Sequence, residues 1–186
     1  MRLTGGRLRG RPVAAPAGLS VRPTADRVRE ALFNRLVHGG GVLGDGDHVR
    51  GQTVLDAFCG TGALGFEALS RGAAQVWALE LDRAVAAGAA ATAASLGLDD
   101  RWAVRVGSAL TPPSAPGAPA SLGFFDPPYN QDSAGAAITA LRAAGWLAWG
   151  SLCVIEHDHR HPPALPAGAS LLDTRRYGRV AVTITC

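Results

Sequence analysis

The sequence contains no lysine, few cysteines and no long apolar run. All 18 basic residues of the 186-residue chain are arginine, which excludes a catalytic lysine. No stretch reaches the roughly 18 uncharged apolar residues that a membrane span requires. The first residues, MRLTGGRLRGRP, lack the apolar core of a signal peptide. Cys59, Cys153 and Cys186 form neither a metal-binding spacing nor a disulfide framework. We therefore expect a cytoplasmic protein that binds no membrane and no metal.

Basic charge is concentrated near the N-terminus. Residues 1–50 carry nine arginines and four acids, a balance of +5, whereas the other 136 residues sum to −2. A basic arm on a nearly neutral body indicates an anionic partner, most often a nucleic acid. Two other interpretations stay open: a solvated arm with incidental charge, and arginines that pair with Asp26 or Glu30 on a helix. The candidate phosphate contacts are Arg9, Arg11, Arg22, Arg27 and Arg29.

Strands and helices alternate along residues 51–186, which predicts an α/β fold. We expect a Rossmann-like, doubly wound sheet of seven mostly parallel strands that ends in an antiparallel hairpin. Residues 1–50 are expected to add a basic arm with a β-hairpin and a helix, so residues 51–186 form the main domain. The expected strands are 53–58, 75–81, 102–106, 124–125 and 151–156, with two more within 170–185; the expected helices are 63–71, 83–96 and 133–145.

A glycine-rich loop follows the first expected strand of the main domain. Gly60, Gly62 and Gly65 match G-x-G-x-x-G, and Glu80 ends the next strand. Such glycines let the backbone approach an adenosine cofactor, and the acid accepts hydrogen bonds from ribose hydroxyls. This pattern alone does not distinguish NAD from S-adenosylmethionine.

Asp56 favours S-adenosylmethionine over a dinucleotide. It ends the strand four residues before Gly60, where a carboxylate would repel a pyrophosphate but attract the ammonium group of a methionine moiety. The alternative is that Asp56 only caps the following turn, although an acid that ends a buried strand needs a partner.

The tetrapeptide Asp126-Pro127-Pro128-Tyr129 follows an apolar Phe pair at the same expected sheet edge. Its chemistry suits methyl transfer to an exocyclic amino group. The Asp126 carboxylate and the Pro127 carbonyl can each accept one amino hydrogen and so aim the nitrogen lone pair at the methyl donor. Tyr129 offers a ring for stacking against a base, which must leave its own stack to reach the site. The candidate catalytic residues are therefore Asp126, Pro127 and Tyr129.

The motifs VLDAFCGTGALGFEALSRGA and FFDPPY resemble those of class I S-adenosylmethionine-dependent amino-methyltransferases. The block VRPTADRVREALFN (21–34) and the tail RRYGRVAVTI (175–184) are similar to the bacterial 16S rRNA guanine-N2 methyltransferases of the RsmD type. The resemblance implies methylation of one guanine N2 in 16S rRNA, free or within a 30S subunit or assembly intermediate, by a monomer. The cofactor residues predicted from these motifs are Asp56, Phe58, Gly60, Gly62, Glu80, Leu81, Ser108 and Ala109.

The chain departs from many class I enzymes at the end of the third strand. These enzymes place an acid there to meet the adenine amino group, whereas Gly107-Ser108-Ala109 offers only the Ser108 hydroxyl or the backbone.

Three other functions compete with this interpretation. A DNA adenine or cytosine amino-methyltransferase would share the Asp-Pro-Pro-Tyr chemistry, but the chain lacks a sizeable target-recognition domain. Asp56 disfavours a dinucleotide-dependent oxidoreductase. The intact acids Glu80 and Asp126 disfavour a non-catalytic RNA-binding protein on a decayed methyltransferase fold.

Overall fold

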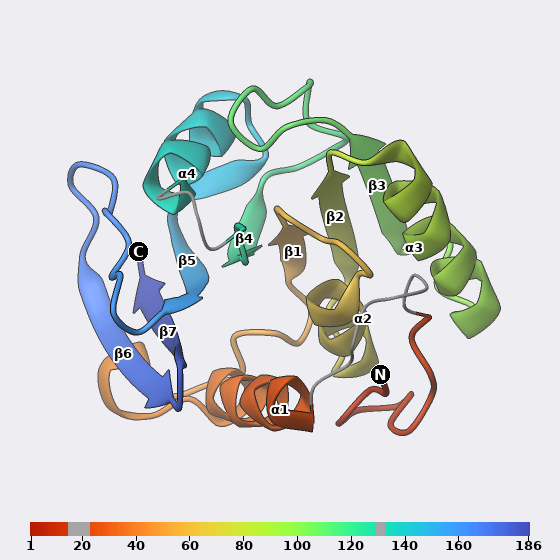
Figure 1. The fold of residues 1–186 in the computed structure, drawn as a ribbon, viewed down its shortest axis with the longest axis horizontal. Coiled ribbons are helices and arrows are strands. Elements are labelled where there is room, and N and C mark those ends of the chain that lie inside the picture. The colour runs from red at the N-terminus through yellow and green to blue at the C-terminus, as the bar shows by residue number, and fades with distance from the viewer. Residues whose placement is uncertain (15–22, 129–132) are drawn as a thin grey trace.

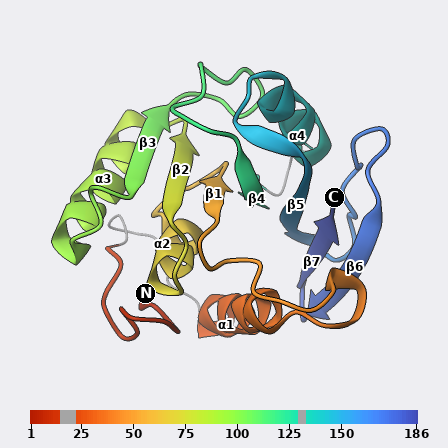
Figure 2. The same cartoon turned by 180° about the vertical axis from the view of Figure 1, so that it is seen from behind.

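The computed structural model describes residues 1–14, 23–128 and 133–186, and one sheet of seven strands crosses this part of the chain. The strand order is β3-β2-β1-β4-β5-β7-β6, from right to left in Figure 1 and from left to right in Figure 2. The first five strands are parallel, and β7 runs antiparallel to β5 and β6. The predicted fold class is thus confirmed. The strands are β1 (Thr53–Asp56), β2 (Gln75–Glu80), β3 (Trp102–Val106), β4 (Ala120–Phe125), β5 (Leu147–Asp158), β6 (Leu171–Tyr177) and β7 (Val180–Thr185).

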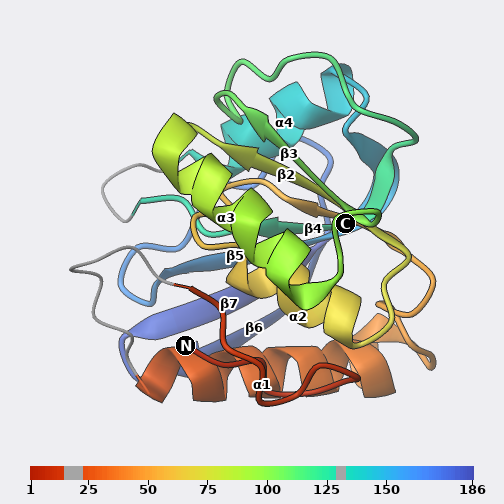
Figure 3. The ribbon, with the colours of Figure 1, turned by 90° about the vertical axis from the view of Figure 1, so that its right-hand side faces the viewer.

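Helices cover both faces of the sheet. Successive strand residues point to opposite faces, so Val54 packs into the core beneath α1, α2 and α3, whereas Leu55 packs into the core beneath α4. Figure 3 shows the strands between α4, at the top, and α2 and α1, below. The helices are α1 (Pro23–His38), the short 3-10 helix η1 (Gly41–Leu43), α2 (Ala63–Ser70), α3 (Arg83–Leu96) and α4 (Ala134–Ala143). None of the helices in the described ranges is long and apolar enough to span a bilayer.

The ends of α3 follow from its sequence. The Asp82 side chain accepts hydrogen bonds from the backbone N–H groups of Ala84 and Val85, at 2.7 and 3.1 Å, and so caps the first turn. Gly97 ends the helix with a φ of 66°, a conformation that favours glycine. The predicted helix 83–96 therefore matches the structure.

Three predicted elements differ from the structure. The strand expected at 124–125 begins four residues earlier, at Ala120. The strand expected at 151–156 begins earlier, at Leu147. Gly150, with a φ of 75°, lies at an irregularity in the pairing with β4, and β5 continues on both sides of it. The expected N-terminal β-hairpin is reduced, within residues 1–14, to one antiparallel bridge between Arg2 and Pro12. Gly6 and Gly10, both at positive φ, turn the chain too tightly for regular strands to form there.

The N-terminal arm, residues 1–14, packs against the main domain. Leu3 and Val13 are 2% exposed and share a hydrophobic core with Phe33 of α1 and Phe66 of α2. The arm, α1 and one face of the sheet therefore stabilise one another.

Candidate active site

The carboxyl ends of β1 to β4 surround a cavity of about 550 Å³, which we call the first cavity. The strand order reverses at this point: β2 and β3 are added on one side of β1, and the chain then returns to place β4 on the other side of β1. Open parallel sheets bind ligands at such a point, and the volume suits a small-molecule site. Six of the predicted residues line this cavity: Phe58, Glu80, Leu81, Ser108, Ala109 and Asp126.

Glu80 ties the glycine-rich loop to the end of β2. One carboxylate oxygen accepts the backbone N–H of Gly60 at 2.9 Å, and the other accepts the N–H of Asp82, also at 2.9 Å. Both bonds fix the orientation of the carboxylate, which stays half-buried at the cavity wall. Each oxygen has a second lone pair with which to accept a hydrogen bond from a ligand hydroxyl.

Gly62 directly precedes α2 as its N-cap and has no room for a side chain. Its φ is 80°, and a Cβ atom there would lie 2.5 Å from the Phe66 ring and 2.9 Å from Trp102. The close approach of these two rings therefore requires glycine at this position of the loop.

Asp56 lies beneath the loop and not on the wall of the first cavity. It is 2% exposed, and one carboxylate oxygen accepts the backbone N–H of Gly65 at 3.0 Å. The capping alternative is thus present in the structure. Asp56 does not line the first cavity, and its attraction for a cofactor ammonium group stays a prediction. Burial raises the pKa of Asp56 to about 7, with a further contribution from the Glu80 charge, against the lowering effect of the Gly65 hydrogen bond.

The residues that follow β3, together with Leu81 after β2, give the first cavity an apolar wall and one hydroxyl group. Ala109 is buried, and Leu81 and Leu110 are 73% and 41% exposed along the same cavity. The Ser108 oxygen accepts the backbone N–H of Leu110 at 3.1 Å. Its proton remains available for a ligand acceptor.

Asp126 directly follows β4 and is accessible from the first cavity. The surrounding protein nonetheless displaces enough water to raise the pKa of Asp126 well above its ordinary value, and repulsion from Glu156 and then Asp56 adds to this effect. Phe125, the last residue of β4, pairs with Ile155 of β5, and the residue that follows each of them is an acid, Asp126 and Glu156. Sequence reasoning gave Glu156 no role, although an acid near the end of a strand at this edge is the signal that marked Asp126.

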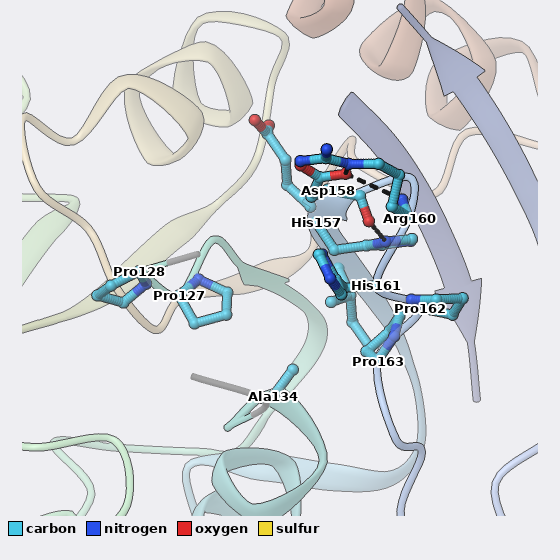
Figure 4. Close-up of a pocket in the computed structure, with 11 residues that line it drawn as sticks. Pro127, Pro128, Ala134, His157, Asp158, Arg160, His161, Pro162 and Pro163 are labelled. Carbon is cyan, nitrogen blue, oxygen red and sulfur yellow. Dashed lines mark hydrogen bonds and ion pairs between the residues drawn. The ribbon is translucent and has the colours of Figure 1, made fainter. Parts of the chain in front are cut away.

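A second cavity of about 380 Å³ adjoins the first at Pro128, which lines both. Figure 4 shows Pro127 and Pro128 on one side, and the end of β5 at His157 and Asp158 with the following segment to Pro163 on the other. Arg160 is held there by Asp158, with nitrogen–oxygen distances of 3.0 and 2.8 Å.

His157 has a structural role at the end of β5. Its ring nitrogens lie 2.9 Å from the Thr183 hydroxyl and 2.9 Å from the Asp158 carbonyl oxygen. In the described ranges, no three Asp, Glu, His or Cys side chains group as metal ligands would.

The predicted phosphate contacts separate into three groups. Arg9, Arg11 and Arg27 are exposed, whereas Arg22, like the predicted base-stacking Tyr129, lies outside the described residues. Arg29 corrects the prediction, because it is 5% exposed and its guanidinium binds other groups of the protein.

The guanidinium of Arg29 lies in a buried network around Glu67. It donates to Asp26 at 3.0 Å, to the Arg2 carbonyl oxygen at 2.6 Å and to Glu67 at 3.4 Å. The alternative pairing with Asp26 is therefore correct, and Arg29 connects the arm, α1 and α2.

Comparison with known proteins now decides the family, since the model described as Conserved hypothetical protein 95 matches residues 1–186. This chain belongs to that family. The chain is 37% identical over 182 residues to Ribosomal RNA small subunit methyltransferase D of Escherichia coli (strain K12). The aligned residues cover 97% of this chain and 87% of that protein. The Haemophilus influenzae protein of the same name is 32% identical over 186 residues and covers 97% and 91%. The solved structure of yhhF from Escherichia coli superposes with a TM-score of 0.81 at 36% identity and covers 100% and 96%.

Proposed function

We propose that the protein transfers a methyl group from S-adenosylmethionine to the exocyclic N2 of a guanine in 16S rRNA. One observation carries the proposal: Asp126 lines a cofactor-sized cavity, and the next two residues, Pro127 and Pro128, line a second cavity beside it. The names of the Escherichia coli and Haemophilus influenzae relatives support small-subunit rRNA as the substrate. The exposed arginines of the N-terminal arm and α1 support a nucleic-acid partner.

The lining of the first cavity fits S-adenosylmethionine. The fixed Glu80 carboxylate would accept hydrogen bonds from ribose hydroxyls, and the apolar wall of Leu81, Ala109 and Leu110 would pack against adenine. The Ser108 hydroxyl would stand in for the acid that other class I enzymes use near adenine. When bound, this cofactor supplies a methyl group that an amino nitrogen can accept.

Asp126 and Pro127 would activate the amino group. The nitrogen lone pair is delocalised into the base, so acceptors that each bind one amino hydrogen draw it towards tetrahedral geometry. The two prolines stiffen the backbone here, which holds the Pro127 carbonyl in one orientation. The nitrogen loses one proton as it gains the methyl group, and the raised pKa of Asp126 suits that carboxylate to accept the proton and release it to solvent.

Asp56 would act on the cofactor mainly through the loop that it holds. Its bond to the Gly65 N–H fixes the start of α2, and its charge lies beneath the glycine-rich loop, where it would attract the ammonium group of the methionine moiety. We therefore expect Asp56 and Asp126 to divide the work between cofactor binding and chemistry.

Radiolabelled methyl transfer tests the proposal. The protein is incubated with labelled S-adenosylmethionine and with unmethylated 16S rRNA, 30S particles or DNA, and mass spectrometry of the nucleosides identifies the product. We expect N2-methylguanosine from an RNA substrate and none from DNA. Label in DNA alone would favour the DNA amino-methyltransferase alternative.

Cofactor binding is measured separately by thermal shift. S-adenosylhomocysteine should raise the melting temperature, and NAD should leave it unchanged. Stabilisation by S-adenosylhomocysteine without methyl transfer to any RNA would contradict the proposed function, whereas stabilisation by NAD alone would favour an oxidoreductase.

A further inference from the structure

We propose that Glu156 selects guanine by accepting the N1–H of the target base, which lies in the second cavity with its amino group directed at Asp126. The inference rests on the proposed function and adds to it a residue that determines base specificity. Nothing in the methyl-transfer chemistry itself requires this carboxylate.

The sheet register brings the two acids together. Phe125, the last residue of β4, pairs with Ile155 of β5, and strands lie about 4.8 Å apart in a sheet, so Asp126 directly after β4 comes close to Glu156 on β5. The effect of the Glu156 charge on Asp126 agrees with this placement. Glu156 lines the second cavity, whereas Asp126 lines the first. The pair therefore spans the seam between the two cavities, where a base must meet a methyl donor.

The second cavity offers a rigid place for a purine. Pro127, Pro128, Pro162 and Pro163 contribute stiff apolar surfaces, and its volume of about 380 Å³ lies in the range of small-molecule sites. Arg160 stands at its rim, 56% exposed, as a cation near an incoming nucleotide.

Guanine is the base whose edge matches this arrangement. Its N2 amino group and N1–H place three hydrogen-bond donors side by side. Asp126 and the Pro127 carbonyl take the two amino hydrogens in the proposed function, which leaves N1–H for one more acceptor. Two neighbouring carboxylates repel each other, and that repulsion contributes to the raised pKa of Asp126. Donors from guanine relieve this repulsion, whereas a purine with an acceptor at N1 would lose a hydrogen bond and face a negative charge.

The test uses a purine that keeps the reacting group and changes only N1. The methylated guanine is first mapped in 16S rRNA, and 30S particles are then assembled with guanine or 2,6-diaminopurine at that position. The second base retains the 2-amino group but has an acceptor at N1. Wild-type protein should show a kcat/KM about 10²-fold higher for guanine.

The variant Glu156→Gln should reduce this selectivity. A glutamine amide can donate to an N1 acceptor, so kcat/KM should fall for guanine and rise for 2,6-diaminopurine, and the ratio should drop below about 10. Glu30→Gln, the same change at an exposed position of α1, should keep the wild-type ratio. Binding of S-adenosylhomocysteine and the melting temperature show that each variant is folded.

The outcomes separate the two proposals. An unchanged ratio for Glu156→Gln, or an equal loss of both substrates with cofactor binding intact, would overturn the role of Glu156 and leave the proposed function standing. If the wild-type protein methylates no guanine N2 at all, the proposed function itself fails.

Discussion

The Glu67 carboxylate accepts a hydrogen bond from the backbone N–H of Thr4 at 2.8 Å. The same side chain, fully buried on α2, also binds the Thr4 hydroxyl, Arg29 and Arg71. Groups from the N-terminal arm, α1 and α2 thus meet at one negative charge. This arrangement makes Glu67 the residue that attaches the arm to the main domain.

We expect Glu67→Ala to lower the free energy of unfolding by about 3–5 kcal/mol, because it removes the buried carboxylate that accepts from Arg71 and from the Thr4 N–H and leaves Arg29 with Asp26 but without its second acid. Urea denaturation measures the change. Arg27→Ala removes an exposed charge from the same helix as Arg29 and should change stability by about 0.5 kcal/mol or less. Equal effects of the two substitutions would contradict this account.

The rate of methyl transfer should decrease as the pH falls. This decrease should begin at a higher pH than it would if Asp126 had the pKa of an ordinary aspartate. Asp126 must be ionised to accept an amino hydrogen, and its raised pKa means that it gains a proton well above pH 3.8. The kcat of the wild-type protein, measured from pH 5 to 9 with saturating substrates, should show this fall.

Asp126→Ala should reduce kcat on the order of 10²-fold or more, because it removes a charge placed for the transition state. Affinity for S-adenosylhomocysteine should remain close to that of the wild type, and the fall of the remaining rate at low pH should disappear. A large loss of cofactor affinity would instead assign Asp126 to cofactor binding.

The stability of the protein should depend on the ionisation of Asp56. Its pKa rises from 3.8 in the unfolded chain to about 7 in the fold, so the stabilising effect of the neutral form is complete below pH 3.8 and is lost as the pH rises to 7. As the pH rises from 4 to 8, the free energy of unfolding of the wild type should therefore fall relative to that of Asp56→Asn, by an amount on the order of 2–4 kcal/mol.

Urea denaturation of both proteins at several pH values measures the Asp56 effect. The asparagine carbonyl keeps an acceptor for the Gly65 N–H, so the comparison isolates the charge. Affinity for S-adenosylhomocysteine should decrease in the same variant. A stability difference that does not vary with pH would show that Asp56 has the same pKa in the folded and unfolded states.

Exposed arginines should contribute to the salt dependence of RNA binding. Arg9→Gln and Arg27→Gln should each weaken binding and reduce the slope of log K against log salt by about 1, because each phosphate contact releases counterions. Arg105→Gln makes the same change at an exposed position of the edge strand β3 and should keep the wild-type slope. Filter binding with 16S rRNA from 50 to 300 mM salt measures the slopes. Equal slopes for all three variants would show that neither Arg9 of the arm nor Arg27 of α1 contacts RNA phosphates.

Much of the fold could be predicted because local signals agreed with the tertiary structure. Asp82 and Gly97 mark both ends of α3, and the four central residues of β2, Val76 to Leu79, form an uninterrupted apolar run. The first part of β5 could not be recognised, since Gly150 is a typical strand breaker and the strand extends back past it through the pairing of Leu147 with Ala120 of β4. Pairing of this kind depends on residues far along the chain.

The site could be predicted as far as strand ends determine it. Glu80 and Asp126 lie on the cavity because parallel strands bring their carboxyl ends to one edge. Arg29 misled the prediction, because its partner Glu67 is 38 residues away and a helical arginine looks the same whether it faces solvent or a buried acid. The position of Asp56 beneath the loop likewise follows from packing and not from spacing.

The attachment of the arm at Glu67 has a consequence for the order of folding during synthesis. Ribosomes release the N-terminal end first, yet Thr4 bonds Glu67, and Gly5 and Leu8 bond Ser70, across more than 60 positions of the chain. Residues 1–14 must therefore wait outside the exit tunnel until α2 has emerged. During that delay the arginines of the arm carry their charge unpaired, which keeps the nascent segment soluble before it finds its place.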